Sequence, residues 1–144
     1  MKNIKFITGI WTGIYTYDSE VFNDKSIPFT MSLALEKGEI KGQYYESRDD
    51  GGMPVPAEIK GYIEGDTIRL IMQHPYLMYI DETGEYRKDE TKPNPKTNYF
   101  GDIEGEIVKG TWEMELGYLK QSDGITEKRI TGKWKMKKQT FYWA

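Results

Sequence analysis

One pattern recurs along this chain: a glycine with a bulky apolar residue two positions away on each side. Side chains of a β-strand alternate between two faces, so each such glycine shares a face with its bulky neighbours. A glycine inside a strand costs about 0.5–1 kcal/mol relative to alanine, but it lets a sheet bend sharply and leaves room for a neighbouring aromatic ring. The repeat therefore predicts a strongly coiled sheet that closes into a barrel. It occurs at Trp11-Gly13-Tyr15, Ile40-Gly42-Tyr44, Ile59-Gly61-Ile63, Tyr99-Gly101-Ile103, Val108-Gly110-Trp112 and Ile130-Gly132-Trp134.

Alternation of apolar and polar residues predicts where the strands lie. No window of the chain has a helical period, so we expect an all-β fold. The prediction is an antiparallel up-and-down meander barrel of about eight strands, or up to ten if residues 75–97 add strands to the sheet. The inward stripes are apolar, and we expect the outward stripes to be almost wholly polar. The predicted strands cover residues 10–17, 28–36, 39–47, 56–64, 67–74, 98–104, 107–116 and 128–136, with a short tail at 140–143.

The connections between these strands alternate in length. Lys37-Gly38, Gly65-Asp66 and Gly105-Glu106 are short, glycine-bearing turns of the hairpin kind. The links over residues 18–27, 48–55, 75–97 and 117–127 are longer. In a meander, alternate connections fall at opposite ends, so we expect a closed base with tight turns and a mouth with long loops. We interpret residues 75–97 as an extra hairpin or flap near that mouth.

Binding residues concentrate in loops on a rigid scaffold, so the mouth is the expected functional end. Glu46 and His74 are ionisable residues on inward stripes that reach it. A carboxylate in apolar surroundings is costly unless it is hydrogen-bonded or paired, so we expect Glu46 to meet His74, a tyrosine hydroxyl or a ligand group. We predict that Glu46 and His74 line one cavity. The predicted ligand-binding residues are Tyr17, Phe29, Glu46, His74, Tyr76, Tyr99 and Met114.

Composition excludes several classes of function. The chain of 144 residues has the size of a single domain, 1–144, and its net charge of -3 gives no positive field for nucleic acid. It has no cysteine and one histidine, so we expect no metal site and no cofactor. No segment has the approximately 20 apolar residues of a membrane helix, and no signal peptide is evident. We therefore expect no nucleic-acid or membrane partner and a cytoplasmic location.

The chain resembles the calycin group of barrels, which includes lipocalins, fatty-acid-binding proteins and avidins. Its first strand WTGIYTY, the following PFTMSLAL, the IKG and GTW repeats and a final Gly-x-Trp strand are similar to those of small bacterial lipocalin-like proteins of unassigned role. Lipocalins pair the first-strand tryptophan with a basic residue of the last strand. The resemblance thus implies that Trp11 is paired with Lys135, Lys137 or Lys138. Apart from the resemblance, an eight-stranded barrel is just wide enough either to fill itself with side chains or to hold one small ligand.

Three functions are compatible with these sequence features. The first is non-enzymatic binding of a small, largely apolar ligand in the barrel mouth or lumen. The second is a filled-lumen barrel that serves as a scaffold and acts through its loops in protein–protein interaction. The third is a small hydrolase or isomerase that uses His74 and Glu46 as base and orienting carboxylate. A connected apolar cavity of roughly 300 Å³ or more at the mouth would favour the first function.

Overall fold

The computed structural model describes residues 4–18, 26–46, 56–80, 83, 86–92, 94–121 and 124–139. A short 3₁₀ helix precedes the strands, and every other regular element in the described chain is a β-strand. The elements are η1 (Ile4–Ile7), β1 (Gly9–Tyr17), β2 (Ser26–Glu36), β3 (Glu39–Glu46), β4 (Ala57–Glu64), β5 (Thr67–Gln73), β6 (Leu77–Ile80), β7 (Tyr86–Asp89), β8 (Thr97–Glu104), β9 (Ile107–Gln121) and β10 (Gly124–Lys138).

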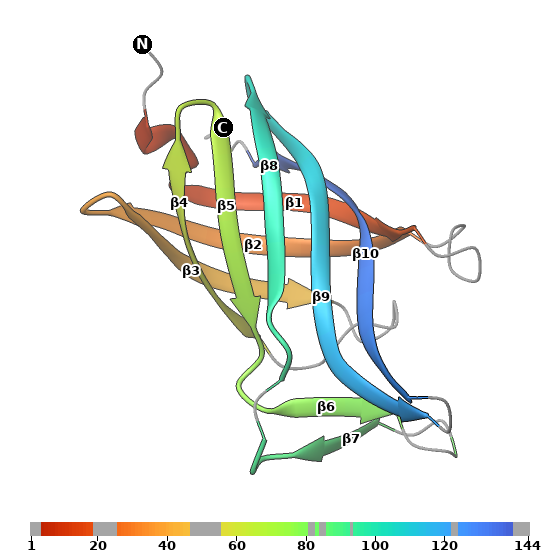
Figure 1. Ribbon diagram of the computed structural model, residues 1–144. Coiled ribbons are helices and arrows are strands. Elements are labelled where there is room, and N and C mark those ends of the chain that lie inside the picture. The colour runs from red at the N-terminus through yellow and green to blue at the C-terminus, as the bar shows by residue number, and fades with distance from the viewer. Residues whose placement is uncertain are drawn as a thin grey trace.

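Eight of these strands form one closed barrel in the order β1-β10-β9-β8-β5-β4-β3-β2. All neighbouring strands are antiparallel, and the first strand closes the barrel by pairing with the last one (Figure 1). The predicted all-β, up-and-down meander barrel is therefore confirmed. Strands β6 and β7 form a separate two-stranded sheet, so the segment after β5 is a hairpin outside the barrel, as interpreted from the sequence.

The repeated glycines do what the sequence pattern indicated, because bulky rings lie directly over two of them. Gly132 of β10 faces Trp112 of β9 across the strand pair. A Cβ atom at Gly132 would lie 2.5 Å from Trp112 Nε1, and one at Gly101 would lie 2.7 Å from Trp134 Cζ2. The missing side chains thus leave the space that the two indole rings occupy inside the barrel.

The base of the barrel is closed by its own side chains. Trp11 and Ile7 are buried, and Trp11 Nε1 donates a hydrogen bond of 2.9 Å to the Ile7 carbonyl oxygen. Phe6 meets Trp11 edge to face at 5.4 Å between ring centroids. Lys138, which pairs with Trp11 in the register, places its ammonium 4.9 Å from the Phe6 ring centroid and donates to the Phe6 carbonyl oxygen at 2.7 Å. Of the three lysines that the resemblance offered, Lys138 therefore reaches the base.

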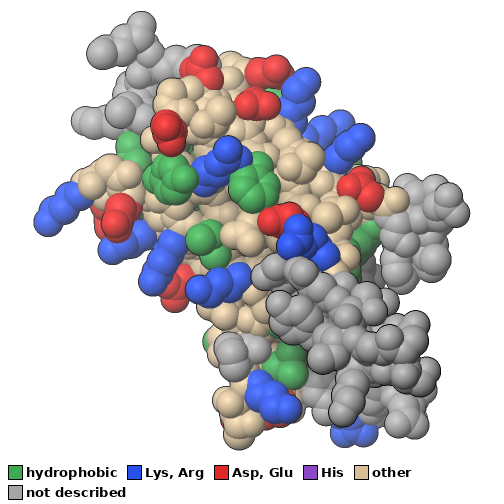
Figure 2. All heavy atoms as spheres, in the orientation of Figure 1, with side chains coloured by type: hydrophobic (Ala, Val, Ile, Leu, Met, Phe, Trp, Pro, Cys, Tyr) green, Lys and Arg blue, Asp and Glu red, His purple; other side chains and the backbone are tan. Residues whose placement is uncertain are grey.

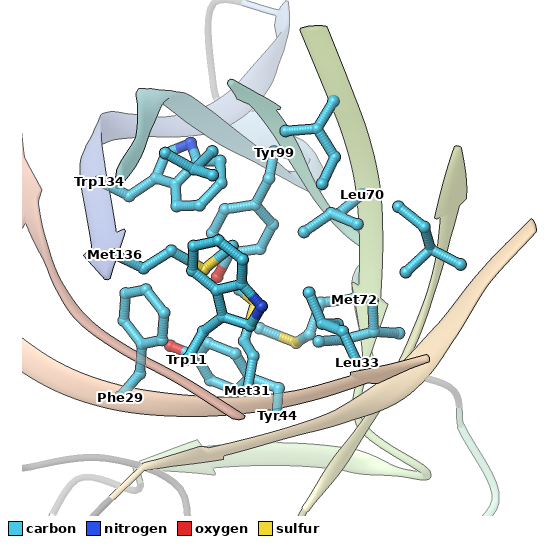
Figure 3. Close-up of a cluster of buried hydrophobic side chains, with 14 of the residues drawn as sticks. Trp11, Phe29, Met31, Leu33, Tyr44, Leu70, Met72, Tyr99, Trp134 and Met136 are labelled. Carbon is cyan, nitrogen blue, oxygen red and sulfur yellow. The ribbon is translucent and has the colours of Figure 1, made fainter. Parts of the chain in front are cut away.

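Above this base, side chains from every wall of the barrel fill the lumen (Figure 3). The rings, methionines and branched residues in this core are almost fully buried, as alternation along the strands predicts. Trp112, Trp134, Tyr44 and Tyr99 all face inward, as expected, and Lys133, Lys135 and Arg69 face outward.

The tight turns lie where expected, but one connection differs from the prediction. Gly38, Gly65 and Gly105 occupy their turns with positive φ angles of 83°, 62° and 64°. The loop predicted over residues 117–127 is wrong, since β9 continues to Gln121 and β10 begins at Gly124. The two strands stay paired beyond a register shift between Lys128 and Arg129. A β-bulge at this point lets the long hairpin bend without losing its pairing.

The outer surface carries more apolar residues than expected. Figure 2 shows apolar side chains scattered between charged ones on one face of the barrel. The exposed large apolar residues among those described are Ile10, Tyr45, Tyr62, Ile71 and Ile107. In addition, the guanidinium of Arg69 lies 4.6 Å from the Phe100 ring centroid on the outer face. The expectation of almost wholly polar outward stripes is therefore wrong for strands β4 and β5 in particular.

Candidate functional site

Glu46 is the last residue of β3 and lies at the mouth. Register pairing sets it directly opposite Phe29 of β2, as the sequence predicted. It shares its face of the strand with Tyr44, because side chains two residues apart point the same way. The Tyr44 hydroxyl donates a hydrogen bond to Glu46 Oε1. Glu46 is half-buried and Tyr44 is fully buried, so the carboxylate lies at the boundary between the packed lumen and the mouth.

Three tyrosines surround this carboxylate, and its charge affects each of them. Burial raises the pKa of Tyr15 far above its usual value, and the Glu46 charge and hydrogen bonds with Tyr17 and Glu46 raise it further. Burial also raises the pKa of Tyr44, with additional contributions from Tyr99 and Glu46. The pKa of Tyr99 is raised by burial and by Glu46, against a lowering contribution from its hydrogen bond with Tyr44. All three hydroxyls therefore remain neutral hydrogen-bonding groups at pH 7.

An unbroken series of aromatic contacts holds these hydroxyls in place. Tyr15 and Tyr17 each meet Trp112 edge to face, with ring centroids 5.5 and 5.4 Å apart. Phe29 stacks on Tyr44 at 5.3 Å. Trp112 is fixed in turn, since its Nε1 donates a hydrogen bond of 3.0 Å to the carbonyl oxygen of Thr16. Edge-to-face and stacked pairs of this kind restrict ring orientation, so the tyrosines form a rigid wall around Glu46.

Thr97 is a further polar residue at this end of the lumen. It is the first residue of β8 and is 2% exposed. The register sets it between Met72 of β5 and Met114 of β9, and Tyr99 follows it on the same face. Its Oγ1 is buried and has no hydrogen-bond partner among the residues that the structure describes. A buried hydroxyl without a hydrogen-bond partner destabilises the folded state by roughly 1–3 kcal/mol. A ligand group that hydrogen-bonded to it would remove that destabilisation.

The structure brings several of the side chains predicted to bind together. Tyr17, Phe29, Glu46 and Tyr99 belong to the cluster just described, and Met114 packs against the core as a partly buried residue. We refer to Tyr15, Tyr17, Tyr44, Glu46, Tyr99 and Thr97 as the mouth cluster.

Tyr76 and His74 are the remaining residues predicted to bind. Tyr76 lies beneath Lys88 of the β6–β7 hairpin, with 5.6 Å from the Lys88 Nζ to the ring centroid. His74 is buried and lines a groove of about 620 Å³ together with Ala57, Gln73 and Lys96. The lining of that groove does not include Glu46. A cavity shared by Glu46 and His74 therefore stays a prediction.

Sequence reasoning missed Tyr15, Tyr44 and Thr97 as site residues. The sequence pattern placed Tyr15 and Tyr44 inside the barrel, one inward position before Tyr17 and Glu46, and so among the core residues. The length of the tyrosine side chain could have identified them as site residues, because a tyrosine that leans along its strand carries its hydroxyl toward the next inward position. Thr97 was missed because the predicted strand began one residue later. Extending the alternation of Tyr99 and Gly101 by one step would have placed Thr97 inside.

Within the described parts of the chain, no group of three or more metal-ligating side chains could hold an ion. Nor is any helix in those parts long and apolar enough to cross a membrane. The mouth cluster contributes one carboxylate and several hydroxyls from separate strands, which is an arrangement suited to hydrogen bonding with a small molecule.

Comparison with known proteins gives two structural likenesses. No protein-family model matches the sequence, and no curated protein matches it. The crystal structure of rhizavidin is similar over 92% of this chain and 87% of its own, with 15% identity and a TM-score of 0.45. The crystal structure of the rhizavidin–biotin complex is similar over 87% of this chain and 98% of its own, with 15% identity and a TM-score of 0.42. These likenesses are too distant to transfer a binding residue to this chain.

Proposed function

We propose that this protein binds one small, largely apolar ligand at the mouth of its barrel and catalyses no reaction on it. The ligand's polar group contacts the mouth cluster, and its apolar part packs against Phe29, Met72 and Met114. Small-molecule sites usually combine an apolar surface with a few convergent polar groups. Methionine adds adaptability, since its flexible side chain can fit ligands of different outline.

One observation carries this proposal: a carboxylate and several neutral hydroxyls converge on the lumen side at the mouth end of the barrel. Trp11, Ile40 and Tyr44 are 0% exposed, whereas Tyr15, Tyr17 and Glu46 nearer the mouth are half-buried. A barrel that served only as a packed scaffold would be more stable with apolar residues at such positions. The filled lower lumen confines the ligand to the mouth.

The second candidate function is a scaffold that acts through protein–protein interaction. The packed lumen favours it, and so do the apolar side chains on the outer face of β4, β5 and β8. Tyr62 is 48% exposed and Ile71 is 43% exposed, with Phe100 beside them on β8. Large exposed apolar residues that gather on one face often mark a contact surface. A hydrolase or isomerase that uses His74 with Glu46 stays a prediction.

A fluorescence titration distinguishes mouth binding from binding to the outer face. The probe is N-phenyl-1-naphthylamine, a neutral apolar dye that brightens in apolar surroundings. The test variant is Met114→Trp, which adds volume at the mouth, and the matched control is Ile71→Trp on the outer face. We expect Met114→Trp to weaken dye binding at least fivefold and Ile71→Trp to leave it unchanged. Near-ultraviolet circular dichroism verifies that both variants keep their packed core.

Two results would contradict the proposal. If the folded parent protein fails to bind the dye, the mouth is not an apolar binding site. If Ile71→Trp weakens binding while Met114→Trp does not, the apolar site lies on the outer face of the barrel, as the scaffold function requires.

A further inference from the structure

We propose that the outer face of β10 is a docking surface for an extended acidic segment of another protein. The surface consists of Lys133, Lys135 and Lys137, which we call the lysine row, with Ile10 and Ile107 at its end nearest the base. It lies outside the lumen, so it is independent of the ligand proposed for the mouth. Three features support the inference: the charge of the row, its spacing and the apolar residues beside it.

The lysine row is a local positive charge on a chain whose net charge is -3. All three lysines are exposed, and within the described chain none of them has a carboxylate at ion-pair distance. The nearby carboxylates bind other cations, since Glu104 pairs with Lys109 at 3.2 Å and Glu113 pairs with Arg129 at 3.6 Å. On the other side of the row, the outward positions of β1 are uncharged: Ile10, Thr12, Ile14 and Thr16.

The lysine row also repels itself, which the fold does not require. The register sets Lys135 directly opposite Lys109 on the outer face, and like charges directly opposite one another destabilise a sheet. Glu104 offsets the charge of Lys109, but Lys135 stays between two further lysines of its own strand. Lys41 and Lys60 form a similar pair across β3 and β4, with no lysine two positions away on either strand. A partner's carboxylates would remove the repulsion along β10.

The spacing of the lysine row matches that of an extended polypeptide. Side chains two residues apart on a strand share a face and lie about 7 Å apart. An extended peptide with an acidic residue at every second position presents its carboxylates at the same interval. Three such carboxylates lie over the three ammonium groups, whereas three consecutive acidic residues place at most two carboxylates on one face. Because lysine side chains are flexible, we expect the preference for alternation to be modest.

Apolar residues beside the lysine row give the partner a second kind of contact. Ile107 of β9 is the register partner of Lys137 and is 44% exposed. Ile14 of β1 is the register partner of Lys135 and is half-buried. A hollow of about 410 Å³ is lined by these four residues among others. A large apolar side chain that follows the acidic residues of the partner can pack against Ile107 and the exposed Ile10.

Two other anionic partners fit this surface less well. Proteins that bind single-stranded nucleic acid combine basic groups with aromatic side chains on which the bases stack. The outward positions of β1 and of residues 129–137 carry no aromatic side chain. Proteins that lie on a membrane insert an apolar face into it, whereas Ile14 is half-buried beside Lys135 in the hollow. An acidic peptide with an apolar residue uses both the charge and the hollow.

Fluorescence anisotropy at low ionic strength, where exposed charges are least screened, tests the inference with two labelled peptides. The first, Asp-Ser-Asp-Ser-Asp-Ser-Leu, alternates its acidic residues. The second, Asp-Asp-Asp-Ser-Ser-Ser-Leu, has the same composition and charge in a block. We expect the alternating peptide to bind at least threefold more tightly than the block peptide, because only the alternating peptide presents three carboxylates to the lysine row.

Variants of the surface locate the binding. Replacing all three lysines of the row with glutamine should weaken binding of the alternating peptide at least tenfold and remove its advantage over the block peptide. The midpoint of thermal unfolding should not fall in this variant, since it removes a repulsion. Lys41→Gln is the matched control, because it removes the same charge from an exposed lysine of the other cross-strand pair. It should leave the advantage of the alternating peptide unchanged.

The apolar contact is tested by Ile107→Ser. This variant should weaken binding of the alternating peptide at least twofold, but it should not affect a version of that peptide in which serine replaces leucine. An equal loss for both versions would contradict a contact between Ile107 and the leucine.

The inference is overturned if neither peptide binds, if the two peptides bind equally well, or if the triple glutamine variant keeps the preference for alternation. It is also overturned if an oligonucleotide of thymidines, or vesicles that contain phosphatidylglycerol, bind to the lysine row while the alternating peptide does not. In that case the row recognises phosphate groups rather than an acidic polypeptide.

Discussion

Replacing Gly132 with alanine tests how tightly the lumen is organised around the repeated glycines. A Cβ atom at this position would lie 1.9 Å from the carbonyl oxygen of Thr16 and 2.5 Å from Trp112 Nε1. These two atoms form the 3.0 Å hydrogen bond that fixes the Trp112 ring. The new methyl group would therefore enter an existing hydrogen bond, and either β1 or the indole must move.

The expected change in the free energy of unfolding combines three contributions. Overpacking an interior costs about 1–3 kcal/mol, and loss of a hydrogen bond costs about 0.5–1.5 kcal/mol. Alanine offsets part of this by about 0.5–1 kcal/mol, because glycine loses more backbone freedom on folding. We expect Gly132→Ala to lower the free energy of unfolding by about 0.5–4 kcal/mol, with a central value of about 2 kcal/mol. Equilibrium denaturation in urea, followed by circular dichroism and tryptophan fluorescence, measures this change.

The matched control is Lys133→Ala, one residue along the same strand. Lys133 is exposed on the outer face, so its replacement should change the free energy of unfolding by no more than about 0.5 kcal/mol. The reasoning is refuted if the two variants unfold at the same urea concentration. In that case Trp112 does not need the space at Gly132.

Two further predictions concern the barrel wall and the tyrosines. Gly61→Val should destabilise the fold by about 1–3 kcal/mol in the same urea assay, because a Cβ there would meet the Arg69 carbonyl oxygen at 2.1 Å; unfolding at the parent midpoint would contradict this. Burial raises the pKa of Tyr15 and Tyr44 in the folded state above the ordinary value of 10.0, so the unfolded chain loses these protons first and stability should fall as pH rises above about 10. Urea denaturation between pH 8 and 11 measures this decrease in the free energy of unfolding. Tyr15→Phe should make the decrease shallower by up to about 1.4 kcal/mol per pH unit. An unchanged slope in that variant would show that Tyr15 is not the group responsible.

Much of the inner wall of the mouth was predictable from the sequence. Period-two alternation assigned Glu46, Phe29 and Tyr99 to inward positions, and the short turn at Lys37-Gly38 set Glu46 opposite Phe29, as the register confirms. These inferences succeed because both alternation and hairpin register depend on residues close in sequence. The long β9–β10 hairpin was missed because the prediction of a loop there also depended on residues close in sequence. Gly117 and Gly124 resembled loop residues locally, although pairing with the partner strand keeps this region extended.

The sequence by itself determined the class of fold, the facing of the strands and the presence of a carboxylate at the mouth, since each follows from local periodicity. Only the tertiary structure decided which hydroxyls surround that carboxylate. Tyr15, Tyr44 and Tyr99 come from β1, β3 and β8, and they meet only because the first strand pairs with the last and closes the barrel. Contacts across a lumen depend on closure, on strand stagger and on side-chain rotamers together, and none of these is encoded in a single stretch of chain.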